Sequence, residues 1–221
     1  MKNFNFPKKI VVFIAFIFST SLGTAGSYDD FFKAVKFDDL RVVQRLLQRG
    51  FDPNTVNPDG VPALMLAVRE SSLKVAELLA AHPQTMAEVR NDKDESALML
   101  AALKGHLNLV QKLVENDADV NKTGWTPLHY AASGGHVPVI DYLLENSAYI
   151  DAESPNGTTP LMMAAMYGSP ESVKTLIQAG ADPTLKNQLG LSALDFAVRG
   201  QRPNGIELMH AGLARWAART K

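Results

Sequence analysis

The chain has 221 residues with 22 Lys plus Arg, 23 Asp plus Glu and no cysteine, and its net charge near neutral pH is −1. Without cysteine it can form neither a disulfide nor a cysteine-linked lipid anchor, so its stability must come from packing. The mildly acidic balance argues against binding to nucleic acid, which requires a basic surface.

The first 25 residues have the pattern of an export signal. Three lysines precede nine apolar residues at 10–18, and small residues follow at 23–25. A helix that spans a bilayer needs about 20 apolar residues, so this short segment favours a cleaved signal peptide over a membrane anchor or a buried N-terminal helix. We expect cleavage after Ala25 or Gly26, which leaves 19 basic and 23 acidic side chains and a net charge of −4.

A short leader on a cysteine-free chain indicates an exported bacterial protein. We expect the periplasm as its location, with full secretion as an alternative that the leader does not distinguish. After cleavage, no membrane association is expected.

After the leader, the sequence repeats with a period close to 33 residues. The marker is a leucine that follows a small residue or proline, and successive markers are 34, 30, 33 and 33 residues apart. They are Leu64, Leu98, Leu128, Leu161 and Leu194. Such a period is typical of a stack of helical units that bury their apolar faces against one another.

The sequence of each unit predicts two helices and a loop rich in turn residues. Thr126 and Pro127 suit the start of a helix, and Gly135 can end it with a positive φ. A Ser-Pro-Asn-Gly segment at 154–157 predicts a hairpin-like finger. Between them lies a second helix, whose apolar stripe consists of Val139, Ile140, Leu143 and Leu144.

The motifs TPLHYAASGGH at 126–136 and TPLMMAAMYG at 159–168 resemble the ankyrin repeat family. The resemblance covers roughly residues 29–200. It implies an all-α ankyrin-repeat solenoid of about six helix-turn-helix units with short hairpin-like fingers, forming one domain over 28–221. The expected units are 28–60, 61–95, 96–124, 125–157, 158–190 and a C-terminal cap at 191–221.

No signature of hydrolysis, metalloproteolysis or nucleotide binding occurs in the sequence. The resemblance assigns His106, His129 and His136 to hydrogen bonds within and between units, and His106 and His136 would lie roughly 10 Å apart, too far to share a metal ion. We therefore expect no enzymatic activity, no metal and no cofactor. One alternative uses Asp92 and Asp94 in a hydrolase or small-ligand site.

The resemblance implies a concave face, built from the fingers and the short helices, that binds a protein. Trp125 precedes the Thr-Pro-Leu element, and a tryptophan on a rim is the residue type that most often anchors an interface. An apolar centre beside it is predicted from Leu103, Met166 and Tyr167, with a charged rim of Lys36, Arg69, Glu70, Lys104 and Arg199. Alternatively, Trp125 packs on its own finger and Met166 fills a gap between units.

One finger departs from the regular length. The segment from Asp117 to Gly124 is three residues shorter than its counterparts, whereas the linker at 80–95 is one residue longer. The short finger predicts a notch in the concave wall beside Trp125, although turns also tolerate length changes without a function.

The repeats, the leader and the lack of catalytic motifs together predict a monomeric, non-enzymatic module that binds an unidentified protein partner in the periplasm. Resemblance to exported bacterial proteins of this kind implies a companion of a stress-defence enzyme or an immunity protein against a toxin. A secreted effector that binds host proteins is the alternative.

Overall fold

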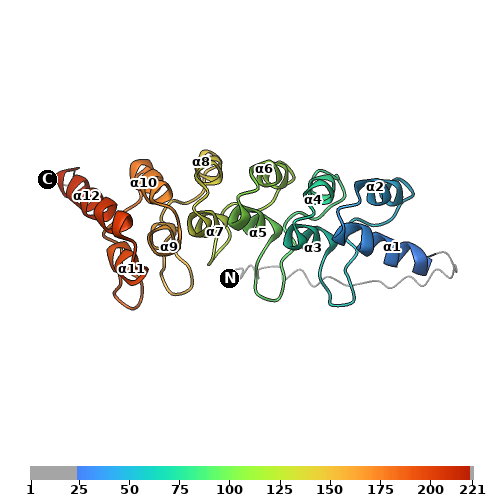
Figure 1. Ribbon diagram of the computed structural model, residues 1–221, viewed down its shortest axis with the longest axis horizontal. Coiled ribbons are helices and arrows are strands. Elements are labelled where there is room, and N and C mark those ends of the chain that lie inside the picture. Colours follow the sequence, from blue (N-terminus) through green and yellow to red (C-terminus); the bar gives the residue numbers. More distant parts are fainter. Residues whose placement is uncertain (1–23, 220–221) are drawn as a thin grey trace, which may run out of the picture.

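The computed structural model of the protein describes residues 24–219. These residues form twelve helices arranged as six consecutive pairs (Figure 1). The first helices of the pairs, here called the inner helices, are α1 (Thr24–Lys36), α3 (Ala63–Glu70), α5 (Ala97–Lys104), α7 (Pro127–Gly134), α9 (Pro160–Tyr167) and α11 (Ala193–Arg199). The second helices are α2 (Leu40–Gln48), α4 (Leu73–Ala80), α6 (Leu107–Glu115), α8 (Val137–Glu145), α10 (Pro170–Ala179) and α12 (Pro203–Arg219).

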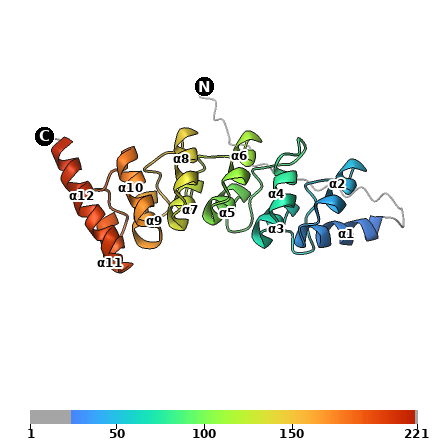
Figure 2. The ribbon, with the colours of Figure 1, turned by 45° about the horizontal axis from the view of Figure 1, so that its top comes forward.

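The pairs are stacked along one axis, with the inner helices in one row and α2 to α10 in a second row beside it (Figures 1 and 2). The last helix, α12, is longer and packs against both α10 and α11. The loops between pairs project away from the second helices (Figure 1). We call these loops the fingers, and they comprise residues 49–62, 81–96, 116–126, 146–159 and 180–192.

At the N-terminal end, α1 begins at Thr24, four residues before the expected start of the domain at 28. Residues 1–23 of the predicted signal peptide lie outside the described residues. None of the helices within 24–219 has the length and apolar character needed to cross a bilayer.

The helix boundaries follow from local capping. Thr126 is the N-cap of α7, Pro127 is its first residue, and Gly135 ends it with a φ of 73°, as predicted. At two other inner helices the N-cap hydroxyl binds an amide of the first turn: Ser96 accepts a hydrogen bond from the Met99 amide in α5 (3.3 Å), and Thr159 accepts one from the Met162 amide in α9 (3.4 Å). These bonds satisfy amides that the first turn of a helix leaves without a partner.

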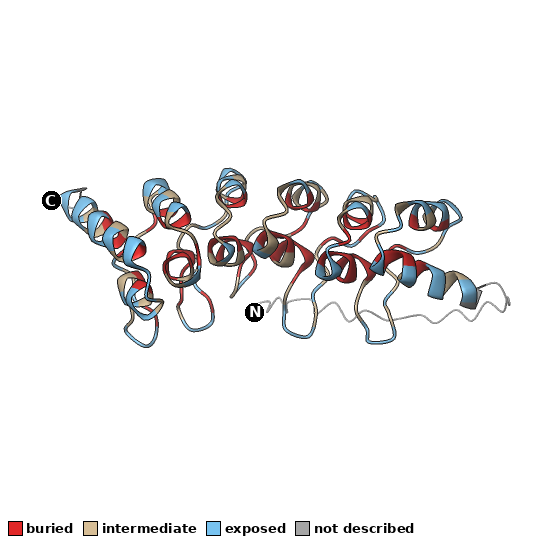
Figure 3. Ribbon diagram, in the orientation of Figure 1, coloured by how far each residue is buried: buried red, intermediate tan, exposed pale blue. Residues whose placement is uncertain are grey.

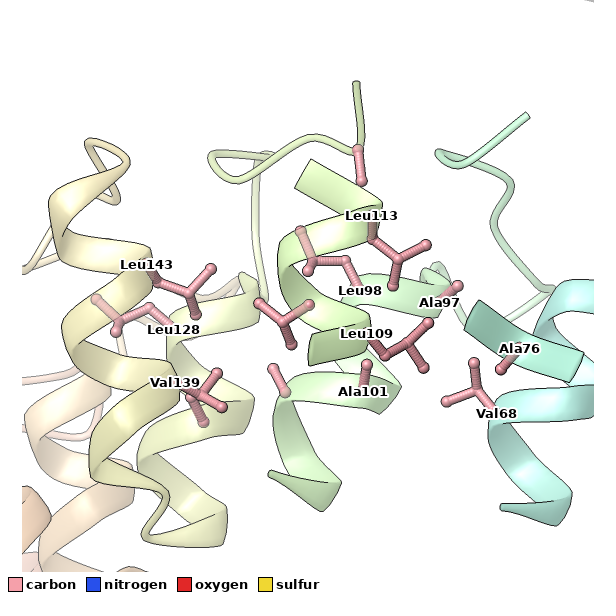
Figure 4. Packing of buried hydrophobic residues seen from close by; sticks show 14 of the residues in the cluster. Val68, Ala76, Ala97, Leu98, Ala101, Leu109, Leu113, Leu128, Val139 and Leu143 are labelled. Atoms are coloured by element: carbon pink, nitrogen blue, oxygen red, sulfur yellow. The ribbon is translucent and has the colours of Figure 1, made fainter. Parts of the chain in front are cut away.

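The apolar core runs continuously through the stack between the two rows of helices (Figures 3 and 4). The marker leucines 64, 98, 128 and 161 are buried, and Leu194 in the last unit is partly buried. In α8, the predicted stripe packs inward, with Val139, Ile140 and Leu143 fully buried. Burying one such side chain contributes about 1.5–3 kcal/mol, so every unit depends on the neighbours that cover its stripe.

Small residues allow the inner helices to approach closely, above all between α5, α7, α9 and α11. Ala131 and Ala132 of α7 are completely buried. At the end of α9, a Cβ added to Gly168 would lie 2.4 Å from the carbonyl oxygen of Ala132, a backbone atom that cannot move aside independently. Glycine is therefore required by the distance between the two backbones at this position.

We expect Gly168→Ala to destabilise the protein by about 1–3 kcal/mol, because the added methyl forces the α7–α9 contact apart. Gly205→Ala is the matched control. Its Cβ would meet its nearest neighbour at 3.4 Å inside α12, so alanine should be neutral or stabilise by up to about 1 kcal/mol. Urea denaturation measures both, and equal effects of the two substitutions would contradict this explanation.

Candidate binding surface

A shallow hollow with a volume of about 240 Å³ opens at the centre of the stack, between α5, α7 and α9. Its shape follows from one small side chain: Ser133 stands where the neighbouring units have Leu103 and Met166. The lining of this central hollow is largely apolar and consists of Leu103, Trp125, His129, Tyr130, Ser133 and Met163.

Other hollows lie toward the ends of the stack. One is beside α12 and has Ser169, Arg202 and Asn204 in its lining, a second lies between α10 and α12 with Gln178 and Arg215, and a third is beside α1 with Asp30, Lys33 and Arg45. All three are lined by more polar and charged groups than the central hollow. The central hollow is the one whose lining resembles the apolar core of a protein interface.

His129 fixes the floor of the central hollow. Its ring is buried and lies against the Trp125 ring with a centroid distance of 5.2 Å in an edge-to-face arrangement. The Thr126 amide donates to Nδ1 (3.1 Å), which assigns the proton to Nε2, and Nε2 donates to the Thr158 carbonyl of the next finger (2.8 Å). The link between neighbouring turns that the resemblance implied for His129 is therefore present.

Burial lowers the pKa of His129 to about 4, so the imidazole is neutral near physiological pH. Its hydrogen bonds depend on this state, because a protonated ring could not accept from the Thr126 amide. The residue is a structural connector between two units, and its electrostatics exclude a role as a proton donor at neutral pH.

Lys122 closes the short finger in front of the hollow. Its side chain is buried, and its ammonium donates to the Asp94 carboxylate (2.5 Å) and to the carbonyls of Thr123 and Trp125 (both 3.1 Å). A buried ammonium is tolerated because all of its donors find oxygen partners. Lys122 thereby attaches the segment that carries Trp125 to the preceding finger.

Tyr130 also lines the hollow and is held by an acidic residue of the preceding finger. Its hydroxyl donates to Glu95 Oε1 (3.1 Å), while the Asn91 amide donates to Glu95 Oε2 (2.9 Å). Burial, together with the Glu95 charge, raises the pKa of Tyr130 to about 12. The phenol therefore stays a neutral donor, and its ring is held in a fixed position.

The structure separates the predicted binding residues into two groups. Leu103, with 39% of its surface exposed, and the half-buried Trp125 both line the hollow. Met166 is half-buried and Tyr167 is 55% exposed, and both lie at the end of α9 outside the lining.

The charged residues of the predicted rim lie at the ends of the inner helices. Arg69 and Glu70 are exposed at the end of α3, where their side chains approach to 3.8 Å, and Arg199 is exposed in α11. Lys104 has a structural role: its ammonium donates to the Val68 and Arg69 carbonyls (3.0 and 2.7 Å) and to Ser71. It thus caps the C-terminal end of α3, where the helix dipole favours a cation.

Sequence reasoning missed Tyr130 and Met163, and it assigned no binding role to Ser133. Tyr130 and Ser133 are three residues apart on α7, so they share one helix face. The predicted binding residues on the inner helices, such as Leu103, Met166 and Tyr167, all lie in the last two positions of a short helix, so Tyr130, one turn earlier, was not among them. A helical-face assignment that extended one turn earlier would have identified Tyr130 and Met163.

The acidic alternative at Asp92 and Asp94 is not supported by the geometry. The hydrogen bond from Lys122 lowers the pKa of Asp94, and Arg90 adds to this with a contact of 3.2 Å. Asp94 is therefore ionised and engaged in ion pairs, which leaves it unsuited to donate a proton. Within residues 24–219, no group of three His, Asp or Glu side chains converges to hold a metal ion.

The geometry defines a solenoid of helical hairpins with an apolar hollow on its inner helices, and the comparisons with known proteins agree. The model of the family "Ankyrin repeats (3 copies)" matches at residues 31–123, 83–154, 120–187 and 150–212. The chain belongs to the ankyrin repeat family. The expected all-α solenoid is confirmed, and ankyrin repeats generally mediate protein–protein interaction rather than catalysis.

Relatives of known sequence are similar to the repeat region of this chain. The nuclear factor NF-kappa-B p105 subunit of Gallus gallus is 34% identical over 161 residues, which is 70% of this chain and 16% of that protein. The ankyrin repeat and SAM domain-containing protein 6 of Mus musculus is 34% identical over 129 residues, or 54% of this chain and 15% of the relative. The chain thus spans about a sixth of either relative.

A crystal structure of an ankyrin repeat domain from Acinetobacter baumannii has the same fold, with a TM-score of 0.71 and 23% identity. The likeness covers 82% of this chain and 96% of that domain.

We expect the stability of the fold to fall as the pH drops from about 6.5 to about 4. The unfolded chain binds a proton on His129 near its ordinary pKa of 6.5, whereas the folded chain resists protonation until about pH 4. This difference amounts to about 3 kcal/mol of stability that is present above pH 6.5 and lost by pH 4. Urea denaturation against pH for the wild type and His129→Gln isolates the effect, since the variant lacks this component. An NMR titration that gives His129 a pKa of 6.5 or more would contradict it.

Lys122→Met should destabilise the protein by about 1–3 kcal/mol, because it removes the donor that two finger carbonyls and Asp94 share. Lys93→Met changes the exposed tip of the preceding finger and should alter stability by less than about 0.5 kcal/mol. Urea denaturation of both variants provides the measurement, and a neutral Lys122→Met would show that the short finger does not depend on this ammonium.

Proposed function

We propose that the chain is an exported, non-enzymatic module that binds a protein partner through its inner face, meaning the inner helices and the roots of the fingers. The central hollow forms the middle of this interface. The observation that carries the proposal is an apolar hollow lined by two aromatic side chains, Trp125 and Tyr130, at positions whose residue type varies from unit to unit.

The aromatic walls are held in place before any partner binds. Trp125 is held by the Lys122 contact to its carbonyl and by the His129 ring, and Tyr130 is held by Glu95. Side chains that are already ordered lose little conformational entropy on binding, which favours affinity. Trp and Tyr are also the residue types that most often dominate the binding energy of interfaces.

Export is supported by the leader pattern in residues 1–25, with its basic start, short apolar segment and small-residue exit. In the periplasm, the module would serve as a companion of a stress-defence enzyme or as an immunity protein that neutralises a toxin. A secreted effector that binds host proteins would use the same inner face in another location.

Truncation of the hollow should abolish partner capture. The wild type should recover a stoichiometric partner from a periplasmic extract. The double variant Leu103→Ala with Trp125→Ala should fail to recover it, because the apolar contacts are lost. Tyr149→Ala is the matched control, since Tyr149 is 68% exposed in the loop after α8 and lies outside the hollow. Equal recovery by the hollow variant and the wild type would refute the inner face as the binding site.

The location is tested separately. The protein should appear in the osmotic-shock fraction with a mature N-terminus at Gly26 or Ser27, determined by mass spectrometry of the intact chain. Recovery in the culture medium or in host cells would favour the effector role, and an intact Met1 would contradict cleavage.

A further inference from the structure

We infer that the partner of the inner face contributes a basic segment that inserts one apolar side chain into the central hollow. This inference rests on the proposed function and specifies the chemistry of the partner. It follows from two features of the described residues: the fingers around the hollow are acidic, and the hollow has the size and lining for one bulky apolar group.

Charge is distributed unevenly between the fingers and the rest of the fold. The five fingers carry eleven carboxylates and five basic side chains, whereas the remaining described residues carry twelve and thirteen. The finger before the hollow, 81–96, contains Glu88, Asp92, Asp94 and Glu95, and the finger after it, 146–159, has Asp151 and Glu153 and no lysine or arginine. The loops that flank the hollow are therefore a local centre of negative charge.

The acidic residues are connected to the lining itself. The Glu95 carboxylate accepts the hydrogen bond of Tyr130, one wall of the hollow. Asp94 shares the Lys122 ammonium with the Trp125 carbonyl, and its side chain is 59% exposed. A cation on a segment lying in the hollow would thus meet carboxylates at the edge of the same surface.

Most basic groups of this region are neutralised within the fold. The Arg90 guanidinium contacts Glu88 at 2.6 Å, Asp94 at 3.2 Å and Asp119 at 3.5 Å, and Lys122 is buried. Lys93 is the exposed base at the tip of this finger, and it is flanked by Asp92 and Asp94. The net field at the finger edge therefore attracts cations and repels acidic segments.

The volume of the hollow favours a side chain over a small molecule. At about 240 Å³ it is smaller than the roughly 300–1,000 Å³ clefts that enclose small ligands, and it is open to solvent. An apolar side chain from a partner can cover Leu103 and Met163 while its own backbone remains at the level of the fingers. This is the arrangement of an anchor residue with a polar rim.

The probe for the test is a phage-displayed library of random 12-residue peptides, selected on the immobilised full mature chain. We expect the enriched peptides to combine one aromatic or leucine residue with several lysines or arginines. Their binding, measured by fluorescence anisotropy with the synthetic peptides, should weaken by about 10-fold between 50 and 500 mM NaCl, since screening removes the charge attraction.

Two variants separate the contribution of the apolar anchor from that of the finger charges. Ser133→Leu fills the hollow with the residue found at the same position of the preceding unit, and it should weaken binding by about 10-fold or more. Asp92→Lys with Glu153→Lys reverses two exposed finger charges and should have a similar effect. The control with the same change in charge, Asp141→Lys with Glu145→Lys on the exposed side of α8, should leave binding unchanged.

The outcomes distinguish the two proposals. One outcome is that Ser133→Leu abolishes peptide binding, while the peptides lack basic residues and bind the Asp92→Lys, Glu153→Lys variant as tightly as the wild type. In that case the basic-segment inference is overturned and the inner face remains the binding site. If no peptide is enriched, the inference is overturned too. If Ser133→Leu has no effect on either the selected peptides or the captured protein, the proposed function fails as well.

Discussion

The packing of each inner helix on the next determines where every other part of the chain lies. Because the marker leucines and the alanines beside them are buried between neighbouring units, no unit can cover its own apolar stripe. Larger side chains are least tolerated where two backbones are in contact, as at Gly168 and Ala132. This close contact sets the spacing of the inner helices, and with it the distance between the side chains that line the hollow.

Polar contacts between consecutive fingers hold the fingers at the same spacing as the inner helices. His129 joins one finger to the next through the Thr158 carbonyl, and Lys122 joins the short finger to the preceding one through Asp94. Both are buried groups whose hydrogen-bonding capacity is used within the chain, so either would be costly to lose. The walls of the central hollow are held by polar contacts that belong to the architecture of the repeat.

The central hollow lies where the repeat departs from its own pattern. A serine stands in place of a bulky side chain at position 133 of the lining, and Trp125, which follows a finger shortened by three residues, is part of the same lining. The regular residues maintain the stack, and the irregular ones distinguish one unit of this chain from the next. The acidic fingers add a charge preference that the repeat itself does not require.

The sequence by itself determined the all-α stack, the caps at Thr126 and Gly135 and the inward stripe of α8, because these features depend on neighbours within one period. It also predicted that Leu103 lies beside Trp125, and both line the central hollow. Only the tertiary structure decided that Tyr130 and Met163 complete the hollow, that Lys104 caps α3 and that Lys122 is buried. These outcomes depend on contacts between units about 30 residues apart, and a periodic pattern does not specify which polar group meets which.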